Sequence, residues 1–390
     1  MEDIMRQYDR AWAEIDLDAV QYNIDRIREK IHADTKIIVV IKTDGYGHGA
    51  VQIARMLERE DSVWGYAVAT AEEAFSLRQN HICKPIMILG YTFPDNYEQL
   101  ISEEVRATVF TYESAKELSE AALRVGKKCR IHIKIDTGMT RIGLHPDDEG
   151  LALIRKILAL PELETEGIFT HFATADEADR TKAYQQMKVF RNYTERISKE
   201  LKFEIPMKHC SNSAAIVEMP EANMDAVRAG IILYGLWPSQ EVKADNKIQL
   251  RPALSLKSRI VYVKTVPKGQ EISYGGTYTT TKDTRVATIC IGYGDGYPRS
   301  LSNVGHVLLK GQRAPILGRV CMDQFMIDVT NINTDICVGD KVTLIGADGG
   351  ECITMEELGE ISGRFNYELA CDIGKRIPRI YKSDDTLLYE

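Results

Sequence analysis

The segment KIIVVIKTDGYGHG, residues 36–49, decides the fold of this chain. It begins with an apolar, β-branched run of the length of one strand, which ends at Lys42. A glycine-rich turn follows, and from residue 50 to 59 apolar residues recur at the i, i+3, i+4, i+7 spacing of one helix face. The segment therefore predicts a strand, a loop and a helix in succession, which is the repeating unit of a parallel sheet.

Seven further apolar runs of strand length precede residue 240. They read WGYAVA from Trp64, PIMILGY from Pro85, RATVF from Arg106, RIHIKID from Arg130, GIFTHF from Gly167, PMKHCS from Pro206 and AVRAGIILYG from Ala226. Segments of helical period lie between them, including 111–125, 147–159 and 180–201. Eight such units in about 200 to 250 residues are the number at which a parallel sheet closes. We therefore predict that residues 1–240 form a (β/α)₈ barrel.

An open, doubly wound sheet is the competing interpretation. In that fold the first strand usually leads into a phosphate-binding turn of the form GxGxxG, whereas residues 42–49 read KTDGYGHG. The barrel is favoured for this reason.

The hydrophobic period changes to two after residue 240. Alternating runs begin at Ala253, Arg285, Arg313, Phe325 and Lys341, with turn signals at 267–269, 338–340 and 348–350. This pattern indicates hairpins in a compact barrel or sandwich. The polar segment 241–249 is the predicted boundary, so residues 241–390 form a β-rich C-terminal domain.

Composition excludes several classes of protein. The 390 residues include 49 Lys and Arg against 57 Asp and Glu, a net charge of −8, which argues against nucleic acid or anionic lipid as a partner. Residues 1–10 lack the apolar stretch of a secretory signal, and no apolar run reaches the length of a membrane span. The eight cysteines are scattered without metal-like spacing, so we expect free thiols, no metal and a cytoplasmic location.

The active site of a barrel enzyme lies at the carboxyl ends of the strands, where several reactive side chains follow the apolar runs. They are Lys42, His132, Lys134, Asp136, His171, Asn212, Ser213 and Arg228. Desolvation at a strand end lowers the pKa of a lysine such as Lys42 and makes it a nucleophile for a carbonyl, although a lysine reaching out to solvent has the same pattern. Ser213 suits a helix N-cap, a phosphate site or both.

Three cations, Arg228, Lys134 and Arg141, need partners that compensate their positive charge. Arg228 stands within a strand, where a guanidinium is costly unless an anion or a hydrogen-bond acceptor meets it. Lys134 and Arg141 repel each other unless Asp136 or a modification of the lysine supplies negative charge. A plain ion pair with Asp136 is the simpler alternative.

The sequence resembles the alanine racemase family over residues 11–379. The resemblance rests on VIKTDGYGHG (40–49), IKIDTGMTRIG (133–143), GIFTHFATAD (167–176), HCSNSAA (209–215), ISYGGTY (272–278), IGYGDGYPR (291–299), GRVCMDQFMIDV (318–329) and FNYEL (365–369). It implies that Lys42 carries pyridoxal 5′-phosphate as a Schiff base and that Arg228 faces the pyridine nitrogen. The residues implied to hold the phosphate are Tyr46, Ser213, Gly230, Ile231 and Tyr367.

The resemblance further implies a base on each face of the substrate, Lys42 for D-alanine and Tyr274 for L-alanine. His171 would lie between Tyr274 and Arg228 and help the tyrosine to act as a base. Tyr274 would reach the site from the other subunit of a head-to-tail homodimer. The product, D-alanine, would supply peptidoglycan in the bacterial cell wall.

Substrate contacts and the entrance follow from the same resemblance. Arg141 and the Met322 backbone amide would bind the substrate carboxylate, and Lys134 matches a position that is a carbamylated lysine in many members. Residues implied to line the entrance are Asp176, Tyr293, Arg299 and Arg319. The chain departs from the common pattern at residues 43–45, which read TDG where Ala-Asn-Ala is usual, at Thr140 in place of glycine, and in CDIGKRIPR near the C-terminus.

Three rival functions fit parts of this pattern. A racemase of broader specificity, for example one that accepts serine, would carry the same residues. A decarboxylase of the same architecture usually has an acidic residue at the pyridine nitrogen, where this chain has Arg228. A non-catalytic cofactor-carrying barrel would lack the 150 or so residues that bear Tyr274.

Overall fold

The computed structural model describes residues 10–383 and the backbone of 386–389. The chain folds into two compact units. The first, the barrel unit, contains residues 21–45 and 50–250; the second, the β unit, contains the N-terminal stretch to Val20, residues 46–49 and the chain from Arg251 onward. The N-terminal strand and the turn 46–49 therefore lie in the β unit, which a single cut at 241–249 does not describe.

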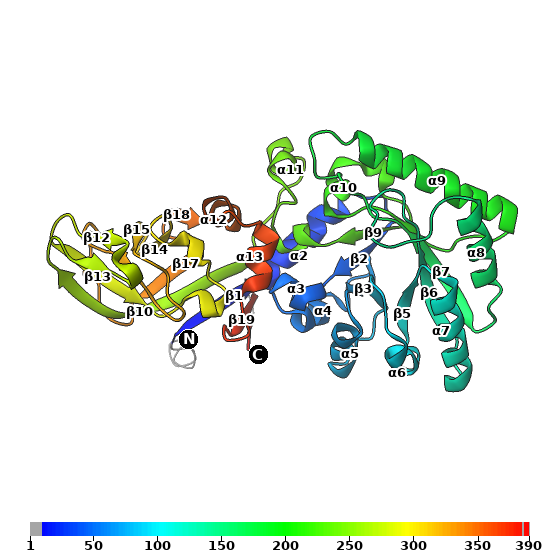
Figure 1. The fold of residues 1–390 in the computed structure, drawn as a ribbon, viewed down its shortest axis with the longest axis horizontal. Coiled ribbons are helices and arrows are strands. Elements are labelled where there is room, and N and C mark those ends of the chain that lie inside the picture. The colour runs from blue at the N-terminus through cyan, green and yellow to red at the C-terminus, as the bar shows by residue number, and fades with distance from the viewer. Residues whose placement is uncertain (1–9, 384–385, 390) are drawn as a thin grey trace. The chain divides into compact units, whose positions relative to one another are not determined.

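Eight parallel strands form the barrel unit, in the order β8-β7-β6-β5-β4-β3-β2-β9 (Figure 1). They are β2 (Lys36–Val40), β3 (Val63–Val68), β4 (Ile86–Ile88), β5 (Val105–Val109), β6 (Cys129–Lys134), β7 (Leu163–Phe169), β8 (Lys208–His209) and β9 (Ala226–Ala229). Backbone hydrogen bonds from Asp225 N to Lys208 O (3.1 Å) and from Arg228 N to Ser211 O (3.0 Å) join the two end strands. The predicted barrel is confirmed: each predicted run overlaps one strand, although β7 begins four residues before its run.

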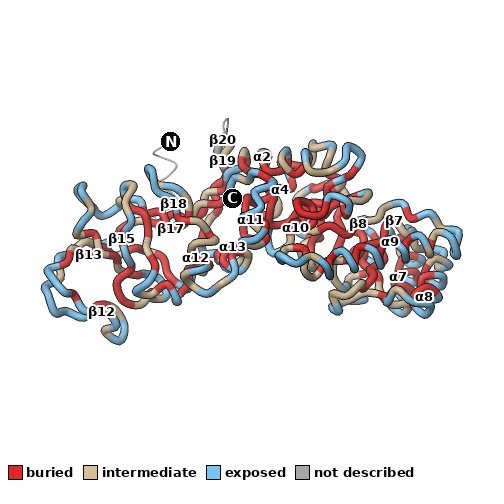
Figure 2. Tube along the Cα trace, turned by 90° about the horizontal axis from the view of Figure 1, so that it is seen from above, coloured by how far each residue is buried: buried red, intermediate tan, exposed pale blue. Residues whose placement is uncertain are grey.

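Helical segments surround these strands, and the longer ones, such as α7 and α8, bury one apolar face (Figure 1). They are α2 (Leu17–Arg28), α3 (Lys42–Tyr46), α4 (Ala50–Leu57), α5 (Ala71–Gln79), α6 (Tyr97–Ser102), α7 (Tyr112–Val125), α8 (Asp148–Leu158), α9 (Thr181–Leu201), α10 (Ser213–Glu218) and α11 (Gln240–Asp245). Asp147 shows why the boundaries were predictable: its carboxylate accepts the Gly150 N–H at 2.8 Å and starts α8. β4, β5 and β9 are buried at every residue, and Figure 2 colours the buried parts of the chain red.

The β unit is built on a closed ring of six antiparallel strands. These are β10 (Leu254–Val266), β13 (Thr284–Ile289), β16 (Phe325–Asp328), β15 (Gln312–Leu317), β14 (His306–Leu309) and β17 (Lys341–Asp348), in that order around the ring. β17 closes it by pairing with β10 from Leu256↔Ile345 to Arg259↔Lys341. The remaining elements are β1 (Ala11–Asp16), β11 (Glu271–Ile272), β12 (Tyr278–Thr279), β18 (Glu351–Ile353), β19 (Arg379–Ser383), β20 (Thr386–Tyr389), α12 (Met355–Ser362) and α13 (Asn366–Asp372).

Three further observations concern the whole of the described chain. No disulfide joins any two of the eight cysteines, all of which lie among the described residues. Within residues 10–383, no helix has both the length and the apolar character needed to cross a membrane. The same residues contain no cluster of three or more His, Cys, Asp or Glu side chains arranged to hold a metal ion.

Candidate active site

Lys42 begins a left-handed turn just beyond the end of β2. The φ angles of Thr43, Asp44, Gly45 and Tyr46 are 53°, 51°, 60° and 52°. Such a conformation costs about 1–2 kcal/mol for each residue other than glycine, so it needs support. Glu73 accepts the Thr43 N–H at 2.5 Å, and Asp44 accepts the Ala50 N–H at 2.9 Å. Asp44 is one of the three residues, 43–45, that differ from the usual family pattern, and here it stabilises the turn.

Close packing explains the glycines that follow this turn. A Cβ at Gly47 would lie 2.0 Å from the Ala370 carbonyl oxygen, and one at Gly49 would lie 1.7 Å from the Tyr381 hydroxyl. In the same unit the ring of Tyr46 packs edge-on against Tyr367, with centroids 6.0 Å apart. Two of the predicted phosphate-binding residues therefore lie together.

Arg228 on β9 is the most constrained cation of the barrel unit. It is 3% exposed, and its two terminal nitrogens donate to the carbonyl oxygens of Thr170 (2.8 Å), His209 (3.1 Å) and Cys210 (3.1 Å). They also meet the Nδ1 atoms of His209 at 2.9 Å and of His171 at 3.2 Å. Neutral acceptors stabilise the guanidinium, and within residues 10–383 no carboxylate forms an ion pair with it.

Burial lowers the pKa of Arg228 to about 10, so it stays protonated at neutral pH. Burial, and then the charges of four surrounding cations, hold the pKa of His171 well below its usual range; these cations are Arg228, Arg141, Lys134 and Lys42. His171 is therefore neutral. The positive charge around it suits an anionic ligand.

Lys134 and Asp136 do not form the simple ion pair that was one alternative. Lys134, 3% exposed, donates to the Ile135 carbonyl oxygen at 3.1 Å, and burial followed by the charge of Arg228 lowers its pKa to about 7. Asp136 accepts the backbone N–H groups of Gly138 (2.9 Å) and Thr140 (3.0 Å) and so holds its own loop. Arg141 follows this loop and is exposed.

Two roles were predicted for Ser213, a helix N-cap and a phosphate site. At the end of β8 the first of these roles belongs to Asn212. The Asn212 side chain is the N-cap of α10 and accepts the Ala215 N–H at 3.0 Å. The Ser213 hydroxyl instead accepts the Gly230 N–H at 3.0 Å, next to Ile231, where a short 3₁₀ turn begins. Ser213 is therefore not the cap, and it lies beside Gly230 and Ile231 as predicted.

Tyr274 lies in the β unit on a strained turn. Ser273 before it has a φ of 68° and a ψ of −179°, a conformation that costs about 1–3 kcal/mol in a residue other than glycine. The Ser273 hydroxyl holds it by donating to the Arg319 carbonyl oxygen at 2.7 Å. Tyr274 itself is 71% exposed, in contrast to the buried Arg228 and Lys134 of the barrel unit.

The remaining predicted entrance and substrate residues are distributed over both units. Met322 and Tyr293 in the β unit are exposed, and Tyr293 and Arg299 line one surface cavity. The Arg319 guanidinium lies against Gly275, where a Cβ would be 3.5 Å from it. In the barrel unit, the Asp176 carbonyl oxygen accepts the Ser239 hydroxyl at 2.7 Å.

Sequence reasoning missed the acceptors behind Arg228. His209 touches the guanidinium directly, and His132 lies in the barrel interior, bonded to His209, instead of at the strand ends. The signal was present in the alternation of polar residues along two strands that otherwise read as apolar, with His132 in RIHIKID and His209 in PMKHCS.

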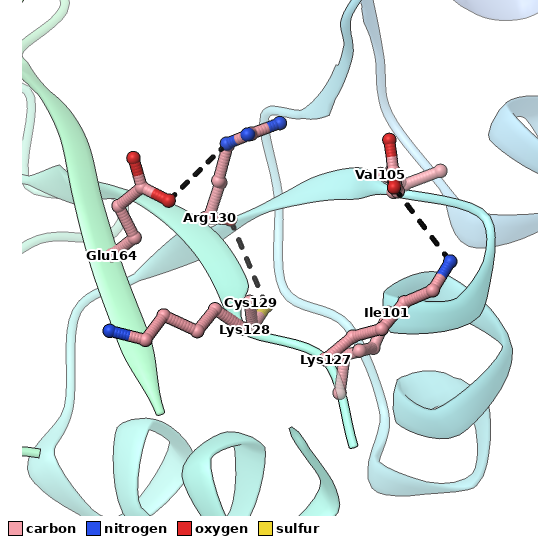
Figure 3. A pocket seen from close by; sticks show the side chains of 8 residues that line it. Ile101, Val105, Lys127, Lys128, Cys129, Arg130 and Glu164 are labelled. Carbon is pink, nitrogen blue, oxygen red and sulfur yellow. Dashed lines mark hydrogen bonds and ion pairs between the residues drawn. The ribbon is translucent and has the colours of Figure 1, made fainter. Parts of the chain in front are cut away.

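A cavity at the opposite end of the strands is a separate feature. Figure 3 shows it at the first residues of β5, β6 and β7, lined by Lys127, Arg130, Glu164 and their neighbours. Two of its cations are paired, since Lys127 lies 3.7 Å from Glu104 and Arg130 lies 3.4 Å from Glu164. It has no part in the strand-end site.

The fold and the strand-end residues define the class of barrel enzymes that carry a second, β-rich domain. Family descriptions match accordingly: "Alanine racemase, N-terminal domain" covers residues 15–238, and "Alanine racemase, C-terminal domain" covers 253–381. An alanine racemase of Clostridium perfringens is 47% identical over 97% of this chain and 96% of its own length. The chain belongs to the alanine racemase family.

Solved structures agree. An alanine racemase of Clostridium difficile superposes with a TM-score of 0.92 at 42% identity, covering 97% of each chain. A histidine racemase of Leuconostoc mesenteroides superposes with a TM-score of 0.87 at 32% identity, covering 96% of this chain and 98% of its own. The family resemblance read from the sequence is confirmed.

Proposed function

We propose that this protein interconverts L- and D-alanine with pyridoxal 5′-phosphate held on Lys42. The observation that carries the proposal is Arg228, a buried guanidinium with fixed acceptors at the carboxyl ends of the barrel strands. Family membership supports it, and we infer that the enzyme acts in the cytoplasm as a source of D-alanine for peptidoglycan.

The residues present fit this cofactor and an amino acid. The cations around His171 suit a phosphate and a carboxylate, and Ser213 supplies a hydroxyl beside Gly230. Lys42 would hold the aldehyde, and Tyr46 and Tyr367 would reach the phosphate. When bound, pyridoxal phosphate withdraws electrons from the amino acid and acidifies its Cα–H. Arg228 would donate to the pyridine nitrogen and keep it unprotonated, because a guanidinium does not release its proton near neutral pH.

Lys42 and Tyr274 would exchange the Cα proton on the two faces of the substrate. Arg228 can only donate, so it fixes Nδ1 of the neutral His171 as the acceptor and leaves the Nε2–H as a donor. A donor at this place would stabilise the phenolate of Tyr274 and let it act as a base. Arg141 and the Met322 amide would bind the substrate carboxylate, near an entrance lined by Asp176, Tyr293, Arg299 and Arg319.

A homodimer would complete the site. The exposure of Tyr274 (71%) and Met322 (52%) suits residues that are covered by another subunit. We infer a head-to-tail dimer in which Tyr274 of one subunit serves the Lys42 of the other.

Lys134 is the proposed site of carbamylation. With a pKa of about 7 it is partly neutral near physiological pH, and a neutral amine adds to CO₂ with release of one proton. The carbamate would place a negative charge opposite Arg141.

Proton NMR in heavy water tests the reaction. The purified protein is incubated with pyridoxal phosphate and L-alanine, and the product is analysed on a chiral phase. We expect deuterium at Cα together with D-alanine. An amine product would indicate decarboxylation, and turnover of serine or histidine would indicate broader specificity.

Mixing two inactive variants tests the shared site. If Lys42 and Tyr274 come from different subunits, a hybrid of Lys42→Ala and Tyr274→Phe chains contains one intact site. Activity should reappear after the chains are mixed and exchanged, up to about a quarter of the wild-type value for random pairing. No recovery in a verified hybrid would contradict the shared site.

A further inference from the structure

A single hydrogen-bonded chain runs through the barrel interior behind Arg228. His209 Nδ1 meets Arg228 at 2.9 Å, its Nε2 meets Nδ1 of His132 at 3.0 Å, and Nε2 of His132 meets Glu166 Oε2 at 3.2 Å. Arg106 ends the chain by donating to both oxygens of Glu166, at 3.0 and 3.3 Å. Both imidazoles are completely buried.

The two ends of this chain dictate the same proton positions. An ionised Glu166 can only accept, so Nε2 of His132 donates; in a neutral ring Nδ1 then accepts, and Nε2 of His209 must donate to it. Arg228 can only donate, so Nδ1 of His209 must accept, which again leaves the His209 proton on Nε2. Each ring nitrogen is therefore either a donor or an acceptor, and each hydrogen bond of the chain contains one proton.

Burial and charge keep each member in the required state. Burial lowers the pKa of His132 and, together with Arg228, holds that of His209 well below its usual range, so both rings are neutral. Burial alone would raise the pKa of Glu166, but hydrogen bonds from His132 and Arg106 lower it to about 2. The carboxylate is the one negative charge of the chain.

Packing holds the rings in line. Phe169 stacks on His209 with an interplanar angle of 3° and a centroid distance of 4.9 Å. The ring of His132 lies directly on Gly167, where a Cβ would be 2.4 Å from its Nδ1. Only a residue without a side chain at position 167 on β7 leaves room for the His132 ring, which extends from β6.

We propose that Glu166 is a positioning residue, which fixes the tautomers of His132 and His209 and thereby presents a ring acceptor, and not a ring donor, to Arg228. With the opposite tautomers an N–H of His209 would face the N–H of Arg228, and the guanidinium would turn away from its three carbonyl acceptors. The effect on turnover rests on the proposed function; the tautomers themselves do not.

NMR of the cofactor-loaded protein labelled with [¹⁵N]histidine measures the tautomers directly. Long-range ¹H–¹⁵N spectra distinguish a proton on Nε2 from one on Nδ1, with resonances assigned by single histidine replacements. We expect both His132 and His209 to be neutral with the proton on Nε2. A proton on Nδ1 of either ring in the wild-type protein would overturn the proposal without any variant.

Glu166→Gln tests the cause, and Glu164→Gln is its matched control. Glu164 lies two residues earlier on β7, pairs with Arg130 at 3.4 Å and has no histidine among the contacts described here. In Glu166→Gln we expect mixed tautomers in both rings and a kcat about tenfold lower with KM within about twofold, as for outer partners of a site. Glu166→Asp, which keeps the charge, should recover the Nε2–H signals and part of kcat.

Unchanged tautomers in Glu166→Gln, or equal changes in Glu164→Gln, would overturn the proposal. A wild-type protein that fails to racemise any amino acid would instead contradict the proposed function. Because the tautomer spectra need no turnover, the two failures are distinguishable.

Discussion

Arg228 and Tyr274 are two polar side chains in opposite environments. Arg228 is buried and meets five acceptors, whereas Tyr274 is 71% exposed on a turn that is held by its neighbours and leaves the ring itself free in solvent. The barrel unit holds the Arg228 guanidinium in place with acceptors of its own chain. The β unit instead has a backbone turn that presents the Tyr274 side chain outward.

Replacement of Lys42 should have the largest effect on function and no large effect on the fold. Lys42→Ala should lose the visible absorption of the bound cofactor and all measurable turnover. Lys36→Ala at the exposed start of β2, where Nζ donates to the Asp61 carbonyl oxygen, is the control and should retain both. Turnover by Lys42→Ala would refute its assignment.

Tyr274→Phe should separate function from stability in the β unit. Loss of the base should lower kcat by about 10²–10⁴, while the free energy of unfolding should change by no more than about 0.5 kcal/mol because the hydroxyl is exposed. Tyr262→Phe, a 54% exposed tyrosine on β10, is the control in the racemase and urea-unfolding assays. Full activity of Tyr274→Phe would remove the two-base mechanism.

Arg228→Lys, unlike Tyr274→Phe, should lower both the activity and the free energy of unfolding. An ammonium group has three donors in another geometry, so several of the five acceptors lose their partner, at a cost of about 2–4 kcal/mol in unfolding free energy. Arg130→Lys on β6, where the arginine is exposed, should cost less than about 0.5 kcal/mol. Urea unfolding measures both; equal values would show that Arg228 is not a structural anchor.

Glu166 should make the barrel unit sensitive to acid. Its folded pKa of about 2 lies below the ordinary value of 4.5, so its stabilising contribution is complete above about pH 4.5 and is lost as the pH falls toward 2. The difference in unfolding free energy between wild type and Glu166→Gln should shrink by about 2 kcal/mol over this range, since a fifth of the side chain remains in contact with water. A difference independent of pH would contradict the Glu166–His132 contact.

The smallest expected effect concerns Thr140, where the family usually has glycine. Its φ of 59° is unfavourable for a β-branched residue, so Thr140→Gly should stabilise the protein by about 0.5–1 kcal/mol. Thr181→Gly, at the start of α9, should have the opposite sign because glycine weakens a helix. Differential unfolding of the two variants measures both signs.

Local patterns made most of the barrel predictable. A buried parallel strand is recognised by its own apolar run, and the caps of α7 and α8 by Thr111 and Asp147. β1 was missed because its partners, β10 and β19, lie more than 230 residues away in the chain. For the same reason a boundary drawn along the sequence at 241–249 does not group β1 with the C-terminal strands to which it is bonded.

The residues of the candidate site also differ in whether the sequence revealed them. Lys42, Ser213 and Arg228 were recognisable because each follows or interrupts an apolar strand, and the resemblance of the motifs supplied Tyr274 and Tyr367. Glu166 lies outside the predicted runs, and the alternation of polar residues that marks His209 does not identify its partner. Their importance depends on distances across the barrel to Arg228 and His132, which are contacts between different strands.

By itself the sequence determined the strands, the helices and the identity of the reactive side chains, because hydrophobic period and capping act over a few residues. The tertiary structure alone decided the ring of six strands in the β unit, the left-handed turn after Lys42 and the direction of the hydrogen bonds behind Arg228. These depend on groups far apart in the chain, each of which has to satisfy the buried donors and acceptors of another.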